Sequence, residues 1–278
     1  MPTEQVLKKK LKGITTTRKI SKAMKTAATV KYSQLSAVYS GYSEYAIQCR
    51  ELYGIFGNDF LNEFLSVKPD APVCYIVMAS NKGMCGNFNT DLFNYAENLL
   101  SDENERKELI LCGEKTIFYF KNKGYESVKD YIFSDVPRFS EAKSLCDDLR
   151  ALFSEKEYSS VKIVYPQYVN MVRQYPCVKD LLNPESAHSS NADDMLFIPD
   201  KETVIKQSSE KIVESMLYGF ILETAIGAQA ATVMSMRSAY DAAVEYEEKL
   251  ESEINRKRQS RVTADVIETF AEYYRDEE

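Results

Sequence analysis

Apolar side chains between residues 28 and 56 recur at alternating spacings of four and three. The positions in this register are Ala28, Tyr32, Leu35, Tyr39, Tyr42, Ala46, Cys49, Tyr53 and Phe56. Four heptads in one frame indicate a coiled-coil seam, because a globular helix needs only a shorter stripe. Residues 3–58 contain no proline. We therefore expect one helix of roughly 80 Å, at about 1.5 Å per residue.

Toward the start of the chain, this frame meets polar residues. Continued backwards, it passes through Arg18, Ser21 and Lys25, and then reaches the apolar Leu7, Leu11 and Ile14. A shifted apolar stripe is available at Ile20, Met24 and Ala27. The pattern predicts that the seam loosens or rotates in the first third of this helix.

The other end of the chain shows a similar pattern. Residues 202–274 contain no proline, and the only glycines are Gly219 and Gly227. Apolar residues at helical spacing are Leu217, Ile221, Ala225, Ala228, Ala231, Ala239, Ala243, Tyr246 and Leu250. This predicts a second long helix, and we expect the two ends to pair as one long antiparallel coiled coil.

A cluster of small side chains lies within this second helix, at residues 225–231. Small residues allow another helix to approach closely. The large aromatic residues Tyr32, Tyr39 and Tyr42 on the first helix are the expected complements.

The middle of the chain alternates between short apolar runs and helical patterns. Strands are predicted at 73–79, 109–112, 128–133 and 160–165, and helices at 87–100, 114–123 and 140–155. Such alternation is typical of a mainly parallel, layered sheet, so we expect a central Rossmann-like α/β domain. The predicted division is 1–60 for the first helix, 61–200 for this domain and 201–278 for the last helix. The polar residues 183–194 are expected to form a mobile loop.

Composition narrows the function classes. The 278 residues carry a net charge of −7 with a pI near 5.1, which argues against general nucleic-acid binding. No signal peptide and no unbroken run of 18 apolar residues is present, so any membrane association is expected to go through partners. Six cysteines without a CxxC pair, and His188 as the only histidine, argue against a zinc site. Reduced, mostly buried thiols are expected.

The segment from Ser80 to Asn87 has the composition of a phosphate-binding turn between a strand and a helix. Its sequence, SNKGMCGN, fits neither GxGxxG nor GxxxxGK[ST]. Cys85 lacks a suitable base, because His188 lies in the predicted loop. We interpret the segment as a tight structural turn, and we predict no catalytic residue, cofactor or metal.

Basic residues gather at both ends of this acidic chain. Residues 1–31 hold nine lysines and arginines and one acid, Glu4, and a second cluster lies at residues 256–261. If the end helices are antiparallel, both clusters fall at the same tip. Such a tip suits acidic partners, although a solvated helix face would show the same charges.

Four segments carry a family resemblance. RKISKAMK at residues 18–25 is similar to T-x-K-I-T-K-A-M-K, and SNKGMCGNFN at 80–89 is similar to S-D-R-G-L-C-G-G-F-N. Residues 164–182 follow a strand, F/Y-x-N-x-x-V, P-x-x-x-x-L-L pattern, and residues 230–263 share spaced matches with A-A-R-M-x-A-M-K-x-A-x-D-N-A and N-K-A-R-Q. In this order, the segments resemble the gamma subunit of the F-type ATP synthase.

The resemblance implies a non-catalytic central rotor shaft. The paired helices would turn inside a hexamer of alpha and beta subunits, and the α/β domain would sit against the epsilon subunit and the c-subunit ring. Rotation would couple proton or sodium flow to ATP synthesis or hydrolysis, at the cytoplasmic face of the cell membrane or its organellar equivalent. Residues implied to contact the alpha and beta subunits are Lys22, Met24, Arg258, Gln259, Thr263 and Asp265. Phe197 and Ile198 would belong to the foot that faces epsilon and the c ring.

The chain departs from the family pattern at two places. The S-E-x-A-A-R-M motif reads GAQAATV at residues 227–233, which removes its Glu and Arg, and Y-x-Y-E-P reads MLFIP at 195–199. We interpret the chain as a divergent branch or paralogue. Its contacts with the alpha–beta ring (the bearing) or with epsilon and the c ring (the foot) would be adjusted.

Two other functions are compatible with parts of the pattern. A non-rotary coiled-coil scaffold would need the same paired helices. An enzyme would use the turn at Gly83–Gly86 as an anion site, and its nucleotide binding would depend on Lys82.

Overall fold

The computed structural model describes residues 3–64, 71–101, 106–156, 158–181, 198 and 200–275. The chain forms two compact units. One consists of Met1–Ala27 together with Val233–Glu278, and the other of Ala28–Thr232. The three-segment division along the sequence stays a prediction.

Two long helices account for both ends of the chain. Helix α1 spans Glu4–Phe64 with 61 residues, and α5 spans Lys201–Arg275 with 75 residues. The side chain of Asp200 caps α5, because its carboxylate accepts the Thr203 backbone N–H at 2.8 Å and the Thr203 hydroxyl at 2.9 Å. These hydrogen bonds lower the pKa of Asp200. The absence of proline allows both helices to continue without interruption.

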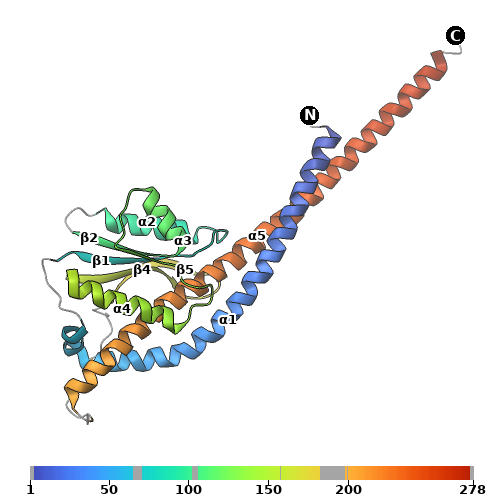
Figure 1. Cartoon of the computed structure of the whole chain (residues 1–278). Helices are drawn as coiled ribbons and strands as arrows, with labels where there is room; N and C mark the ends of the chain where they lie inside the picture. Colours follow the sequence, from blue (N-terminus) through green and yellow to red (C-terminus); the bar gives the residue numbers. More distant parts are fainter. Residues whose placement is uncertain are drawn as a thin grey trace. The chain divides into compact units, whose positions relative to one another are not determined.

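The larger unit contains a five-stranded sheet in the order β3-β2-β1-β4-β5 (Figure 1). The strands are β1 Val73–Met78, β2 Lys107–Cys112, β3 Lys129–Tyr131, β4 Ser160–Tyr168 and β5 Gln174–Asp180. The first four strands are parallel, whereas β5 pairs antiparallel with β4. The predicted α/β fold with long terminal helices is confirmed, and β5 is the strand that the sequence patterns did not predict.

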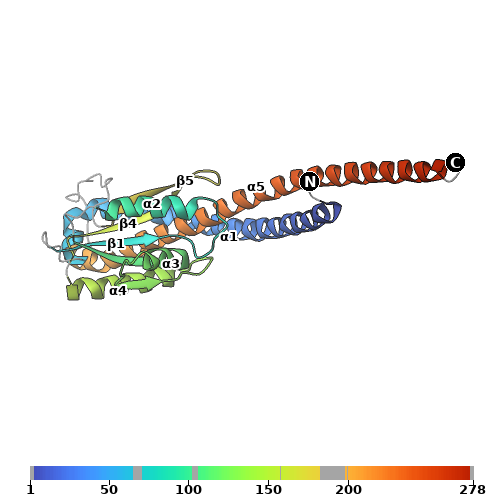
Figure 2. The same cartoon turned by 90° about the horizontal axis from the view of Figure 1, so that it is seen from above.

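Helices cover both faces of this sheet. Helices α2 (Phe88–Leu100) and α3 (Glu114–Asn122) lie on one face, and α4 (Phe139–Lys156) lies with α5 on the other (Figures 1 and 2). All six residues of β1 are buried, because alternate side chains face opposite layers. This explains why the run at 73–79 is continuously apolar.

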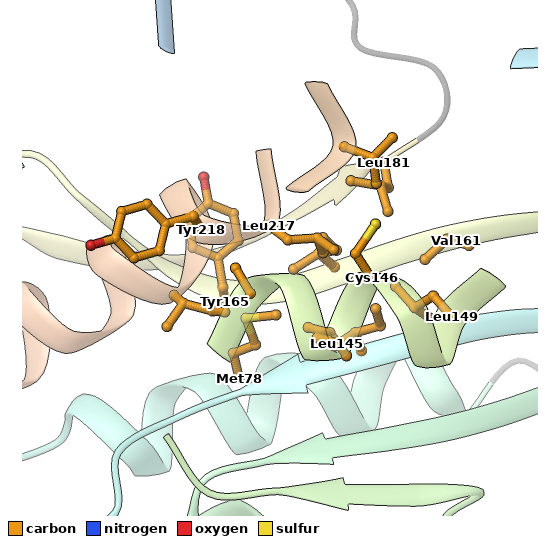
Figure 3. Packing of buried hydrophobic residues seen from close by; sticks show 14 of the residues in the cluster. Met78, Leu145, Cys146, Leu149, Val161, Tyr165, Leu181, Leu217 and Tyr218 are labelled. Atoms are coloured by element: carbon orange, nitrogen blue, oxygen red, sulfur yellow. The ribbon is translucent and has the colours of Figure 1, made fainter. Parts of the chain in front are cut away.

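The core between the sheet and α5 is built from large side chains (Figure 3). Met78 and Tyr165 of the sheet meet Leu145 of α4 and Leu217 of α5, and all four are at most 2% exposed. Full burial of one such aliphatic side chain contributes about 1.5–3 kcal/mol. The first part of α5 is therefore a core helix of the α/β unit.

Within the same unit, α1 packs along the predicted seam. Leu35 and Cys49 are buried, and the seam positions from Ala28 to Cys49 are all buried or half-buried. Tyr53 and Phe56 lie outside the described side chains. The seam prediction is confirmed for the side chains that the structure describes.

The two glycines of α5 have different neighbours. Tyr42 packs at Gly219, where an added Cβ would lie 2.7 Å from the tyrosine oxygen, and its hydroxyl donates to the Ser215 carbonyl at 2.6 Å. Gly227 instead faces Phe88 of α2, whose ring would lie 3.1 Å from an added Cβ. At Gly227, the small-residue cluster therefore admits a side chain of the α/β domain.

The cysteine side chains agree with the prediction of reduced, mostly buried thiols. None of the six cysteines forms a disulfide; five are buried and Cys177 is half-buried. His188 and the predicted loop lie outside the described residues.

By length and composition, one stretch of α5 is apolar enough to cross a membrane, and 61% of it is buried inside the protein. A core helix of a globular protein shows the same property.

Gly113 connects β2 to α3, and its substitution tests how closely this connection packs against the sheet. Its φ is +99°, and an added Cβ would lie 2.4 Å from the Ala79 carbonyl oxygen. We expect Gly113→Ala to destabilise the α/β unit by about 2–4 kcal/mol, because both the backbone conformation and the clash oppose it. Urea unfolding followed by circular dichroism measures this loss.

Gly124→Ala is the matched control. Gly124 also has a positive φ of +86°, but nothing lies within 4 Å of an added Cβ. We expect a smaller cost of about 1 kcal/mol, from backbone strain alone. Equal losses in the two variants would show that the contact with Ala79 is unimportant.

Candidate functional site: the paired chain ends

The smaller unit is an antiparallel helix pair with a constant register. Arg18 Nε lies 2.6 Å from a carboxylate oxygen of Glu247, and Lys25 Nζ lies 5.4 Å from the ring centroid of Tyr240. Arg261 pairs with Glu4 at 2.9 Å. In each pair, a step forward along α1 is matched by an equal step backward along α5. The two helices therefore stay in one register over this whole length.

Polar residues belong to the seam of this pair. On α5, buried and half-buried residues recur at spacings of three and four: Val233, Met236, Tyr240, Ala243, Glu247, Leu250, Ile254 and Lys257. On α1, the matching positions are Leu7, Leu11, Ile14, Arg18, Ser21 and Lys25. These spacings continue the coiled-coil frame of the chain's first helix back to Leu7.

The expected loosening of the seam is therefore wrong. Ser21 is buried, whereas Ile20 is 52% exposed and Ala27 is also exposed, so the shifted stripe is not used. Only Met24 of that stripe is half-buried. The reason lies on α5, which offers a carboxylate to Arg18 and an aromatic face to Lys25.

The ion pair in the seam is partly shielded from water. The side chains of Arg18 and Glu247 are 32% and 15% exposed. Such a pair adds little net stability compared with apolar residues, but removing one partner leaves a costly charge. Its effect is to fix the register, as polar residues do in other coiled coils.

The two basic clusters come together at one end of the pair, as predicted. A groove there is lined by residues of both chain ends, including Lys8, Arg256 and Lys257. Glu4 accepts Lys8 at 2.7 Å and Arg261 at 2.9 Å, and these cations lower its pKa. The groove is lined by two carboxylates, Glu4 and Glu253, and by four basic side chains, so its net charge is positive.

The residues implied to contact partner subunits lie on the surface of this unit. Lys22, Arg258 and Gln259 are exposed, and Met24 is half-buried. The Thr263 hydroxyl donates to the Gln259 carbonyl at 2.9 Å within its own helix. Thr263 and Asp265 are exposed, and both follow Arg261, the residue level with the start of α1.

An exposed apolar stripe follows on the last part of α5, and sequence reasoning missed it. Val262, Val266, Ile267 and Phe270 are 51%, 48%, 64% and 62% exposed. Because the register pairs Glu4 with Arg261, no described residue of α1 lies alongside these positions. Their spacing of four, five and eight from Val262 is the helical signal that could have revealed the stripe.

The proposed foot residues are described only in part. Ile198 is 78% exposed, and Phe197 lies outside the described residues.

The turn after β1 uses its polar groups internally. The Ser80 hydroxyl donates to the Lys82 carbonyl at 2.6 Å, and the Asn89 amide nitrogen donates to the Cys85 sulfur at 3.4 Å. Burial raises the pKa of the Cys85 thiol, which keeps it protonated. Met84 takes the left-handed conformation, with φ of 66°. These contacts support the interpretation of a structural turn.

Lys82 itself is engaged by a carboxylate. Its ammonium lies 2.6 Å from Asp135, which also binds Lys31 of α1, and the two lysines lower the pKa of Asp135. The adjoining cavity measures about 60 Å³. Its size and the pairing of Lys82 argue against a nucleotide site there.

A protein-family model described as ATP synthase matches residues 3–271. The chain belongs to this family. It is 26% identical to the ATP synthase gamma chain of Pelotomaculum thermopropionicum, over 96% of this chain and 97% of that relative. It is 29% identical to the ATP synthase gamma chain of Desulforudis audaxviator, over 96% and 97% of the two chains. The resemblance to gamma chains is thereby confirmed.

Solved structures share the fold. A chain of the Euglena gracilis mitochondrial ATP synthase, in a structure of OSCP, F1 and c-ring in rotational state 3, superposes with a TM-score of 0.69 at 15% identity. The match covers 96% of this chain and 92% of that chain. A chain of the central stalk and c-ring of the Tetrahymena thermophila enzyme gives 0.60 at 16% identity, over 79% and 99%.

As a gamma chain of the ATP synthase family, the protein is the non-catalytic central shaft subunit of a membrane-bound complex. The antiparallel pair formed by the start of α1 and the later part of α5 is the shaft part of this chain. The prediction of a non-catalytic subunit is thereby confirmed.

The register pair can be tested by a double substitution in this gamma chain. Arg18→Leu leaves Glu247 half-buried without its cation, and we expect a loss of about 1–3 kcal/mol in the free energy of unfolding. Adding Glu247→Leu should restore or exceed wild-type stability, because two apolar seam residues then meet. Chemical unfolding followed by circular dichroism measures both changes.

Arg237→Ala serves as the control. Arg237 and Asp241 form an exposed pair at 3.9 Å, so we expect a change within about 0.5 kcal/mol. A neutral Arg18→Leu variant would contradict the role given to the ion pair.

Proposed function

We propose that the paired ends of this gamma chain turn inside a ring of alpha and beta subunits. The exposed apolar stripe of α5 would bear against the inner surface of that ring. The observation that supports this most is the row of large apolar side chains from Val262 to Phe270, which nothing in the described chain covers. Contiguous exposed apolar side chains on a helix mark a surface that meets another protein.

Charge supports the same assignment nearer the groove. Lys22, Arg258 and Gln259 present cationic or amide groups to solvent, and acidic loops of the catalytic subunits would complement them. Solvent-exposed charges are suited to contacts that form and break during rotation, because each contributes only a small free energy. Thr263 and Asp265 would extend this contact surface along α5.

At the foot, we assign Ile198 and Phe197 to the contact with the epsilon subunit and the c-subunit ring. Ile198 is largely exposed, which suits a docking residue. The chain would then be peripheral, at the cytoplasmic face of the membrane or its organellar equivalent, and attached only through partners. Proton or sodium flow through the ring would drive its rotation.

The non-rotary scaffold that is compatible with the sequence pattern makes a different prediction from the rotor. Such a scaffold would bind its partner statically and would not need an apolar stripe that slides. Co-purification with a nucleotide-hydrolysing alpha–beta hexamer separates the two, because only the rotor requires it.

The bearing can be tested with Val266→Asp and Phe270→Asp in a reconstituted complex. We expect each charge to lower coupled ATP synthesis by about tenfold, because it meets an apolar surface at the cost of desolvation. Circular dichroism of the free chain should be unchanged, since both side chains are already exposed. The control is Glu268→Gln, an exposed polar position of the same segment, which should retain activity. Full activity of both Asp variants would refute the bearing.

The divergent-branch hypothesis needs a separate experiment. At Thr232, where the family motif has an Arg, the hydroxyl donates to the Ala228 carbonyl of its own helix at 2.8 Å and offers no charge to a partner. We expect weak coupling when this chain is combined with standard alpha, beta and c subunits. ATP-driven ion pumping measures it, and full coupled activity would reject an adjusted bearing or foot.

A further inference from the structure

Three carboxylates meet between α4 and α5 of the α/β unit. They belong to Asp147 of α4 and to Glu210 and Glu214 of α5, and one oxygen of each lies within 4.8 Å of the others. We propose that this cluster binds a hard divalent cation, with Ca²⁺ as the best match, and that the cation ties α4 to α5. The proposal is independent of the rotary function.

The buried Glu214 is the observation that points to a ligand. Its side chain has no exposed surface, and its Oε1 atom has no hydrogen-bond partner among the described residues. A buried carboxylate oxygen without a partner is costly, so such an atom calls for a proton donor or a cation. Its membership of the cluster places that need next to two further carboxylates.

The neighbouring cations leave room for a metal ion. Lys211 Nζ lies 2.7 Å from Oε2 of Glu214, and an Arg150 nitrogen lies 3.2 Å from Oε2 of Glu210. Both pairs use the Oε2 atoms, so the two Oε1 atoms remain available as ligands. Three carboxylates against two cations also leave the cluster with a net negative charge.

The spacing of the oxygens favours Ca²⁺. Ligands on opposite sides of Ca²⁺ lie about 4.6–5.2 Å apart, because each bond is about 2.3–2.6 Å long. Mg²⁺, with bonds near 2.0–2.1 Å, would require the side chains to move closer. Glu210 and Glu214 are four residues apart and share one face of α5, and the exposed Asp147 leaves a path for the ion and its waters.

Cys146, beside Asp147 in the sequence, does not turn this cluster into a zinc site. Burial, followed by the charge of Glu214, raises the pKa of its thiol to about 12. The Cys146 sulfur is also not among the ligand atoms that lie within 4.8 Å of one another. The oxygen-only donor set is the one that hard cations prefer.

Titration of the full chain with Ca²⁺, after treatment with EDTA, tests the proposal. We expect Ca²⁺ at about 1 mM to raise the melting temperature by about 2–4 °C. Tb³⁺, which replaces Ca²⁺ and is excited through tyrosine, should bind and be displaced by Ca²⁺. Asp147→Asn and Glu214→Gln should each weaken binding at least about tenfold.

An exposed variant and a control variant keep the proposal falsifiable. Asp147 is exposed, so Asp147→Asn should fold even if the buried Glu214→Gln does not. Glu248→Gln, an exposed substitution elsewhere on α5, should bind like the wild type. The proposal is overturned if the wild type shows no binding, or if Asp147→Asn binds Ca²⁺ and Tb³⁺ with unchanged affinity.

Discussion

A helix that carries an apolar stripe over many turns needs a second helix to cover that stripe. In this chain, the seam of α5 from Val233 to Lys257 is covered by the first part of α1. Two contacts fix the register of the helices, one between Arg18 and Glu247 and the other between Lys25 and Tyr240. Because the side-chain period of each helix is fixed, one constant register leaves every seam position from Leu7 to Lys25 buried or half-buried. The grouping of basic residues at the Glu4 end follows from the same register.

Much of the fold could be predicted from periodicity, because buried strands and long helices impose distinct patterns. The exceptions have physical causes. β5 contains Pro176, which cannot donate to a sheet and disguises an edge strand that pairs with β4 at Pro166. The polar seam positions seemed to break the frame, because their stabilising partners lie more than two hundred residues away on α5. No window of local sequence contains that information.

The functional surface was only partly predictable, for a related reason. The family motifs indicated Lys22, Arg258 and Thr263, but not which side chains would be left uncovered. The exposure of Val262 to Phe270 depends on where α1 begins relative to α5, which is a property of the register. The turn at Ser80–Asn87 illustrates the opposite case. Its phosphate-site composition is explained by internal hydrogen bonds and by the pairing of Lys82 with Asp135.

The central claim is that these paired ends occupy the axis of an alpha–beta ring. Native mass spectrometry of the complex purified through this chain tests it most directly, because it counts subunits. The account predicts a species with one copy of this chain and one alpha–beta hexamer. A chain that is found alone, or in several copies per complex, would contradict it.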